Sequence, residues 1–275
     1  MNDLYFYNHD RKPRIQCCFL ALKKMNRRDV LYFTITAEVS VFSAYTQDVI
    51  YIEDLMSLQK KLSLLYQHKK DKISFTSLND VLKIELEYLD SGHIIQRFYI
   101  REKGTQGLLM IEDYFDQTFL PELNENIDKI LENKDILENC PIQIDDNRRK
   151  ISVQLCNFLK GLSSDYFYFN IQYMGNVFTF SMRSEAYVKE LLQFRDDISA
   201  LLGNRRNECV FNPLGEFYFI KLVKKSDIIL ECDVSDTSCP QNNLMFHETV
   251  DTEVLKNIIN QIELHLLDSE KEKNI

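Results

Sequence analysis

Hydrophobic and polar residues alternate in several short stretches of the chain, a pattern typical of half-buried β-strands. The stretch Val81–Leu89, VLKIELEYL, alternates most regularly, and two further stretches of this kind begin at His93 and Gly107, each after a turn. Earlier in the chain, Ile15–Leu22 and Leu31–Phe42 are rich in the β-branched and aromatic residues that favour strands. We therefore expect a mainly antiparallel sheet in the N-terminal half.

Two other stretches follow helical spacing, with an apolar residue at every third or fourth position. The apolar positions are Leu55, Leu58, Leu62 and Leu65 in the first stretch, and Leu120, Leu123, Ile127 and Leu131 in the second. The order is thus strands, helix, strands, helix, and the connections are too short for the crossovers of a parallel sheet. This order predicts an α+β fold in which a mainly antiparallel sheet carries two helices.

The same order of elements recurs in the C-terminal half. Moving the chain by 136 positions places Ile15 on Ile151, and it places YIEDLMSLQKKLSLL, from Tyr51, on YVKELLQFRDDISAL, from Tyr187. One residue is lost near Gly92, and the offset then becomes 135. The polar positions differ while the apolar positions are retained, and those of the second half's helices are Leu191, Phe194, Ile198, Leu201, Leu255, Ile258, Ile262 and Leu266.

This similarity indicates a duplication, and internal repeats of this length are separate structural units. We predict a first α+β repeat at residues 15–131, a polar connector at 132–150 and a second, diverged repeat at 151–267.

The composition indicates a globular protein. With 275 residues, 45% of them hydrophobic, the chain is long enough to bury a substantial core. The N-terminus, MNDLYFYNHDRKPR, is polar and charged, and no apolar run is as long as a membrane span, so we expect a cytoplasmic protein.

The charge balance bears on possible partners. The formal net charge is −9, and no Lys/Arg cluster is combined with spaced aromatic residues, which disfavours nucleic acid as a partner. An acidic surface suits either simple solubility or a basic protein partner. The sequence leaves the oligomeric state open.

Most motifs that carry catalytic or metal chemistry are absent. The chain has no GxGxxG, GxxxxGK[ST], GxSxG or HExxH, and its seven cysteines are scattered without a CxxC pair. Only His247, in HETVDTE, lies near carboxylates in the sequence, and its counterpart in the first repeat is Glu112. A surface histidine is the simpler interpretation, so no metal, cofactor or catalytic residue is predicted.

The phrase DYFDQTFLPEL, from Asp113, precedes the second helical stretch. Asp116 or Thr118 can accept hydrogen bonds from the free N–H groups at the start of this helix, and Pro121 is tolerated in a first turn. Asp251 and Thr252 occupy the corresponding positions of the second repeat. We interpret these residues as helix caps.

Carboxylates are concentrated around this phrase. They either form an ordinary solvated face or contribute to a surface for a basic partner. The candidate partner-binding residues are Glu112, Asp113, Glu122, Glu125 and Asp128.

Two short motifs resemble a known family. A glycine-histidine pair at the turn between two strands, followed by Asp-Gln-Thr, an aromatic residue, Leu and Pro before the last helix, is similar to the WapI-type immunity proteins of bacterial polymorphic-toxin systems. In this chain the motif residues are Gly92, His93, Asp116, Gln117, Thr118, Phe119, Leu120 and Pro121. The resemblance covers residues 15–131, while the second repeat retains only Asp251 and Leu255 of the last motif.

The resemblance implies a non-catalytic antidote that binds and neutralises a cognate toxin domain, often a nuclease. The chain would then consist of two tandem diverged copies of this family, and its partner would be a toxin protein. Two alternatives remain open on the residues alone: a general protein-binding or scaffold module, and an enzyme of a type that no listed motif reveals.

Overall fold

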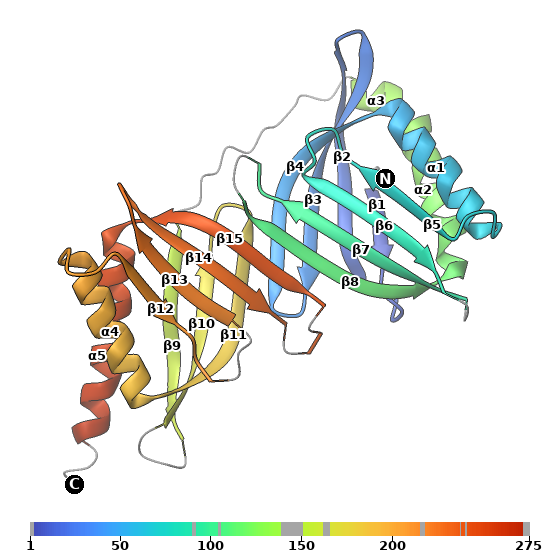
Figure 1. Cartoon of the computed structure of the whole chain (residues 1–275). Coiled ribbons are helices and arrows are strands. Elements are labelled where there is room, and N and C mark those ends of the chain that lie inside the picture. The colour runs from blue at the N-terminus through green and yellow to red at the C-terminus, as the bar shows by residue number, and fades with distance from the viewer. Residues whose placement is uncertain are drawn as a thin grey trace. The chain divides into compact units, whose positions relative to one another are not determined.

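The computed structural model describes residues 3–89, 92–103, 106–138, 151–161, 166–214, 218–236, 238–239 and 241–271 (Figure 1). It is a mixed helix and sheet protein, and the strands within each unit pair antiparallel, so the expected fold class is confirmed at this level. The chain divides into two compact units. Unit 1 comprises Met1–Gly104 and Leu108–Asp146, and unit 2 comprises Thr105–Gly107 and Asn147–Ile275.

Unit 1 contains strands, two long helices, a 3-10 turn and one short helix. Its elements are β1 (Asp3–Tyr7), β2 (Pro13–Met25), β3 (Arg28–Val39), β4 (Phe42–Tyr51), α1 (Ile52–Tyr66), β5 (Lys72–Thr76), β6 (Leu82–Tyr88), β7 (His93–Arg101), β8 (Leu108–Asp116), η1 (Gln117–Phe119), α2 (Leu120–Glu132) and α3 (Lys134–Glu138).

The strands of unit 1 pair in the order in which they follow one another in the chain. Strands β1 to β4 form one run of neighbours and β5 to β8 form another, because short hairpin turns join most of them. Helix α1 carries the chain from β4 to β5 (Figure 1).

The core of unit 1 lies between the two runs of strands and beneath the helices. Phe6 of β1 and Phe98 of β7 pack edge to face with ring centroids 5.2 Å apart. The four leucines of the α1 stripe are all buried, as predicted. Helix α2 packs against α1, and Gln59 of α1 donates to the Asp128 carboxylate at 2.5 Å.

Unit 2 contains seven described strands and two helices. Its elements are β9 (Ser152–Lys160), β10 (Tyr166–Met174), β11 (Phe178–Tyr187), α4 (Val188–Leu202), β12 (Glu208–Phe211), β13 (Tyr218–Lys224), β14 (Ile228–Ser235), β15 (Asn243–Val250) and α5 (Thr252–Lys271).

The strands of unit 2 again form two antiparallel runs, β9 to β11 and β12 to β15. Tyr173 of β10 stacks on Phe246 of β15 at 4.2 Å, and Phe194 of α4 stacks on Phe211 of β12 at 4.4 Å. These contacts place the core between the two runs and the helices. The predicted apolar positions of α4 are buried, as are Leu255, Ile258 and Ile262 of α5.

Several predicted boundaries differ from the structure. Strands β1, β5 and β12 were not predicted. The stretch Leu31–Phe42, predicted to hold one or more strands, contains most of β3 and only the first residue of β4, which pairs antiparallel with β3 and was otherwise not predicted. On α2, Ile130 is buried whereas Leu131 is only partly buried, because the helical period places position 130 on the core side.

The connector predicted at 132–150 begins inside α2 and includes α3, so unit 1 has three described helices. Leu137 of α3 is buried, which explains why this polar stretch is helical. The remainder of the predicted connector, residues 139–150, lies outside the described residues, as do Cys140 and the Leu266 side chain.

Candidate functional site

The predicted capping residue Asp116 lies at the junction of β8 and α2. Its Oδ1 atom accepts a hydrogen bond from the Thr118 amide at 2.8 Å and thereby caps η1, the 3-10 turn that leads into α2. Hydrogen bonds from the backbone and side chain of Thr118, and the nearby His93, lower the pKa of Asp116. The cap prediction is therefore confirmed, although the capped element is η1 rather than α2 itself.

The other motif residues meet at this junction. His93 pairs with Asp116 across β7 and β8, and the Gln117 amide donates to the Gly92 carbonyl at 3.2 Å. Gly92 has a φ of 81°, a conformation that L side chains rarely adopt, which explains glycine in this turn. Tyr88 donates its hydroxyl hydrogen to Gln117 Oε1 at 2.6 Å. The turn before β7 and the start of α2 are thus joined by the motif residues.

The hydrophobic part of the motif anchors α2. Phe119 and Leu120 are buried, and the Arg11 guanidinium lies 5.0 Å from the centroid of the Phe119 ring. Pro121 lies in the first turn of α2, as predicted, where its missing N–H leaves no intrahelical bond unmade.

Aromatic and histidine side chains surround the junction, and apart from His93 of the family-like motif the sequence pattern did not indicate them. Tyr114 of β8 is 46% exposed. The His9 ring stacks on it at 4.9 Å, and the His93 ring lies edge-on at 6.0 Å. A second pair, His68 and Tyr88, packs edge to face at 4.4 Å. These residues come from four separate segments of unit 1, so only the fold could bring them together.

Three of the five candidate partner-binding carboxylates share the exposed face of α2. Glu122, Glu125 and Asp128 follow one another at three-residue spacing, and all three are exposed. Glu125 forms an ion pair with Lys129 at 2.7 Å, whereas Asp128 accepts from the neutral Gln59 amide and so keeps its net charge. We call these three residues the α2 acidic face.

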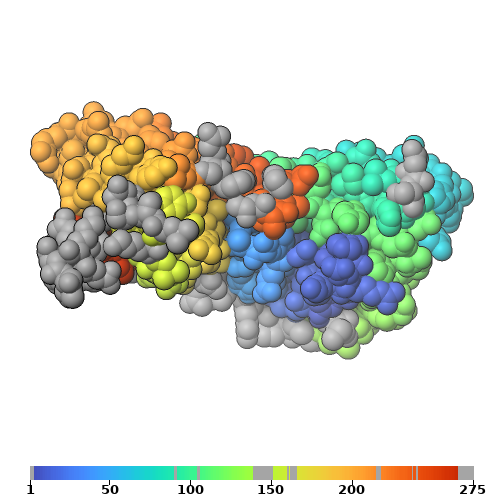
Figure 2. All heavy atoms as spheres, turned by 90° about the horizontal axis from the view of Figure 1, so that it is seen from below, coloured from blue at the N-terminus to red at the C-terminus, as the bar shows by residue number. Residues whose placement is uncertain are grey.

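The other two carboxylates take part in ion pairs on β8. Asp113, with a side chain 12% exposed, accepts from Arg14 Nε at 2.8 Å, and Glu112 accepts from Arg97 Nε at 2.5 Å. Adjacent strand residues face opposite ways, so the two carboxylates belong to different faces of β8. The N-terminal residues, dark blue in Figure 2, lie beside green residues of the same unit, consistent with the Arg14–Asp113 pair.

Arg97 holds a ladder of charges across the outer side of β6, β7 and β8. Its guanidinium bridges Glu87 at 2.7 Å and Glu112 at 2.5 Å, and Lys72 lies 3.6 Å from Glu87. Hydrogen bonding to Arg97 lowers the pKa of Glu87, and the carboxylates in turn raise the pKa of Arg97. This ladder neutralises Glu112 internally. Because Lys129 compensates Glu125, the remaining charge of the predicted set lies mainly on Glu122 and Asp128 of the α2 acidic face.

In unit 2, Asp251 directly precedes α5, and its carbonyl oxygen accepts from the Val254 amide at 3.1 Å. His247 is exposed on β15, opposite Glu231 of β14. Among the described residues, no group of three or more His, Cys, Asp or Glu side chains could hold a metal ion.

The described cysteines are free thiols. Cys17 is buried and Cys18 is partly exposed, as expected for neighbours on a strand. Burial raises the pKa of Cys17 and Cys232 strongly and that of Cys209 to about 12, so these three are protonated and unreactive at neutral pH.

No family model, curated protein or solved structure matches this chain. Among the described helices, none has the length and apolar character needed to cross a membrane.

Proposed function

We propose that this chain is a non-catalytic cytoplasmic immunity protein that binds and neutralises a cognate bacterial toxin domain with a basic surface, a nuclease being the leading candidate. The observation that carries the proposal is the α2 acidic face, which starts one turn after the junction formed by the family-like motif residues. Glu122, Glu125 and Asp128 are exposed there on a helix whose other side is anchored in the core.

The position of these carboxylates suits a recognition surface. A helix presents side chains at fixed positions, so binding its outer face costs little conformational entropy of the backbone. Exposed tyrosines such as Tyr114 supply the rigid aromatic contacts that are enriched in protein interfaces. Opposite charge also speeds the encounter with a basic partner, which matters for an antidote that must act before its toxin does.

The two units are proposed to be tandem repeats of one fold. Helices α1 (Ile52–Tyr66) and α4 (Val188–Leu202) have equal lengths and stand at the offset of 136 found in the sequence. The same offset relates β4 to β11 and β6 to β13, and the offset of 135 relates the starts of β7 and β14. Agreement of element boundaries at both offsets supports a duplication.

Co-expression of the chain with the toxin encoded beside its gene tests the function. The unmodified chain should restore growth of the toxin-expressing cells. A triple variant with Glu122→Lys, Glu125→Lys and Asp128→Lys should restore less growth, because its positive charges repel a basic partner. The matched control makes the same change of charge at exposed positions elsewhere, with Glu38→Lys, Asp71→Lys and Glu263→Lys. If the chain neutralises no neighbouring toxin, the proposed function is wrong. If both triple variants protect equally, the α2 acidic face does not contact the toxin.

A further inference from the structure

In unit 1, hydrogen bonds between side chains join α2 to α1. Asn124 Nδ2 of α2 donates to Ser63 Oγ of α1 at 3.2 Å, and the Ser63 hydroxyl donates to the Gln59 carbonyl oxygen at 3.1 Å. One turn further along α2, the Gln59 side chain donates to Asp128 at 2.5 Å. The buried side chains of both helices are all leucine or isoleucine, so this polar row stands apart from the rest of their interface. We call Gln59, Ser63, Asn124 and Asp128 the α1–α2 polar row.

A second set of contacts fixes the start of α2. The Tyr88 hydroxyl donates to Gln117 Oε1 at 2.6 Å, just before α2 begins. The Tyr88 ring packs against His68, two residues beyond the end of α1, and the Tyr88 amide donates to the Asp71 carbonyl oxygen at 2.7 Å. The same tyrosine therefore contacts the segment that follows α1 and the segment that leads into α2.

Asn124 is an unfavourable residue for the interior of a helix pair. Its Oδ1 atom is buried and has no hydrogen-bond partner among the described residues. An unpaired buried acceptor destabilises a protein, and an apolar residue at the same place would avoid the loss. A single polar residue in a helix interface can nevertheless fix the register, because apolar side chains alone also pack in neighbouring arrangements.

The repeat provides an internal comparison for this row. At the offset of 135, Asn124 corresponds to Ile259 of α5, which cannot make the bond to a serine hydroxyl. Glu122 and Glu125 of the α2 acidic face correspond to Asn257 and Asn260. The polar tie and most of the acidic face are thus replaced together in the second repeat.

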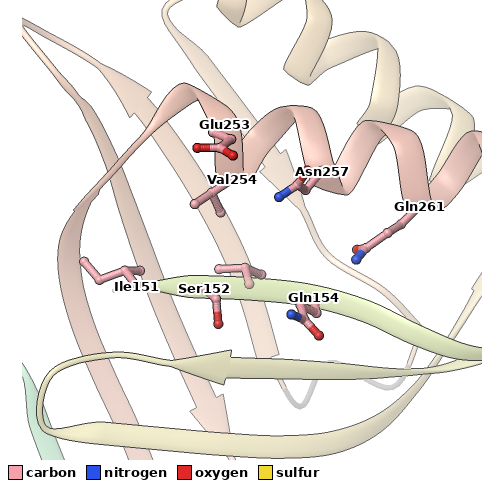
Figure 3. Close-up of a pocket in the computed structure, with 8 residues that line it drawn as sticks. Ile151, Ser152, Gln154, Glu253, Val254, Asn257 and Gln261 are labelled. Atoms are coloured by element: carbon pink, nitrogen blue, oxygen red, sulfur yellow. The ribbon is translucent and has the colours of Figure 1, made fainter. Parts of the chain in front are cut away.

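The last helix of unit 2 is bonded to a strand. The Leu155 amide of β9 donates to Gln261 Oε1 of α5 at 2.9 Å. Figure 3 shows Gln261 directed towards β9, and Gln261 and Asn257 line a cleft of about 210 Å³ between this strand and α5. Each unit therefore places its last helix with a different set of polar contacts, and only the set in unit 1 accompanies an acidic face.

We propose that Asn124 and Gln117 are positioning residues, which fix the register and direction of α2 on α1 so that the α2 acidic face meets the toxin in one arrangement. This inference rests on the proposed function for the identity of the partner. Carboxylates held in one arrangement lose little conformational freedom on binding. A small movement of α2 should therefore weaken binding although no contacting residue has changed.

Asn124→Ile, which places the residue of the second repeat in the first, separates positioning from stability. The variant loses the unpaired acceptor, so it should unfold at the same or a higher urea concentration than the unmodified chain. Residual dipolar couplings should nevertheless show a changed direction of α2 relative to strands β6 to β8. The dissociation constant for the purified toxin domain encoded beside the gene should rise about tenfold. A residue needed only for folding would change stability and binding together.

Two further variants complete the test. Ile259→Asn makes the reverse exchange in unit 2, so it should lower stability and leave both the α2 couplings and toxin binding unchanged. Tyr88→Phe removes only the hydroxyl that bonds Gln117 and keeps the ring, so it should weaken toxin binding about fivefold, as expected for one lost hydrogen bond.

The inference is overturned if the α2 couplings of Asn124→Ile match those of the unmodified chain, or if they differ while toxin binding stays the same. It is equally overturned if Ile259→Asn weakens binding as much as Asn124→Ile does. If the unmodified chain binds no toxin, the proposed function is wrong and the role in recognition falls with it. The couplings are measured without toxin, so they still show in that case whether Asn124 fixes the direction of α2.

Discussion

At the scale of single residues, Asp116 shows which contacts can be predicted from neighbouring residues in the sequence and which cannot. The Asp-x-Thr spacing predicted a cap, and the carboxylate does bond the Thr118 amide. The spacing did not indicate that His93 and Gly92 lie beside it, because these contacts are made across two strands and a turn. Caps depend on neighbours in sequence, whereas the junction depends on the register of the sheet.

Replacing Asp116 by Ala should destabilise the protein by about 1 kcal/mol, the usual effect of losing a capping side chain. The pKa of Asp116 is lowered in the folded chain, so its stabilisation is complete above the unfolded pKa and is lost as the pH falls through the folded pKa. Urea unfolding at neutral pH should show the difference, and the difference should shrink as the pH is lowered through the depressed pKa of Asp116.

Asp251→Ala is the matched control, because Asp251 contributes its backbone carbonyl to the start of α5 and that carbonyl survives the change. A loss of stability as large as that of Asp116→Ala would contradict the assignment of a side-chain cap at Asp116 alone.

Asp48 is a buried acid that the sequence did not single out. It is 4% exposed in the C-terminal half of β4. Its oxygens accept from Asn79 Nδ2 at 2.6 Å, the Val49 amide at 2.8 Å, the Val81 amide at 3.2 Å and the Ser77 hydroxyl. These bonds tie the end of β4 to the turn between β5 and β6. Four donors satisfy one carboxylate, so its removal leaves several of them unpaired.

We expect Asp48→Ala to lower the free energy of unfolding by about 3 kcal/mol, because buried donors then lose their acceptor. Asn79→Ala, which removes one of the donors and leaves the carboxylate satisfied, should cost about 1 kcal/mol. Thermal or urea unfolding of the two variants measures which substitution lowers the free energy of unfolding more. Equal losses would show that the Asp48 carboxylate is not the acceptor on which the other hydrogen bonds depend.

At the scale of elements, the four long helices were predictable, whereas the short helix α3 and the short strands were not. The α1 stripe, Leu55, Leu58, Leu62 and Leu65, repeats over about three turns, which fixes both the element and its buried face. Strands β1, β5 and β12 have only four or five residues, too few for alternation to separate a strand from a loop.

The turn between β3 and β4 was missed for a different reason. Ser40 adopts a φ of 46° there, although glycine or asparagine is the usual residue in this conformation. The sequence AEVSVF therefore continues the apolar alternation through the turn, and the prediction of one or more strands at Leu31–Phe42 did not place the end of β3. The residue types around Ser40 do not indicate a turn, because the pairing of β3 with β4, and not the local sequence, imposes its positive φ.

The hairpin between β2 and β3 offers a stabilising change. Asn26 and Arg27 form its two-residue loop with φ values of 51° and 66°, as a type I′ turn requires. Arg27→Gly creates the favoured Asn-Gly pair and should raise the free energy of unfolding by about 1 kcal/mol, because glycine adopts positive φ without strain. Arg27→Ala removes the same side chain but keeps the strain, so unfolding measurements should show no comparable gain.

At the scale of the whole molecule, the net charge and the repeated pattern of apolar positions were visible in the sequence, but which carboxylates form ion pairs was not. The candidate carboxylates are close in sequence, yet the fold pairs Asp113 with Arg14 and Glu112 with Arg97, partners far away along the chain. Of the five candidate carboxylates, those of the α2 acidic face are exposed, and Glu125 among them is paired with Lys129. An excess of acidic residues therefore locates a binding surface only after the internal ion pairs are known.

The net charge of −9 should make toxin binding fast and sensitive to salt. Long-range attraction extends about 30 Å at 0.01 M ionic strength but only about 8 Å at 0.15 M, so the association rate constant should fall steeply over this range. Dissociation, which depends on short-range contacts, should change far less. Stopped-flow measurements with the purified toxin domain separate the two rates.

The two triple variants then decide whether total charge or its location governs this rate. Each set of three changes to Lys moves the formal net charge from −9 to −3, so a purely global effect would slow both variants equally. If the α2 acidic face meets the toxin, its reversal should lower the rate about tenfold more than the control set at low salt, and the difference should shrink as salt screens the charges. Equal rates for the two variants would assign the attraction to the whole surface and leave the α2 face without a special part in recognition.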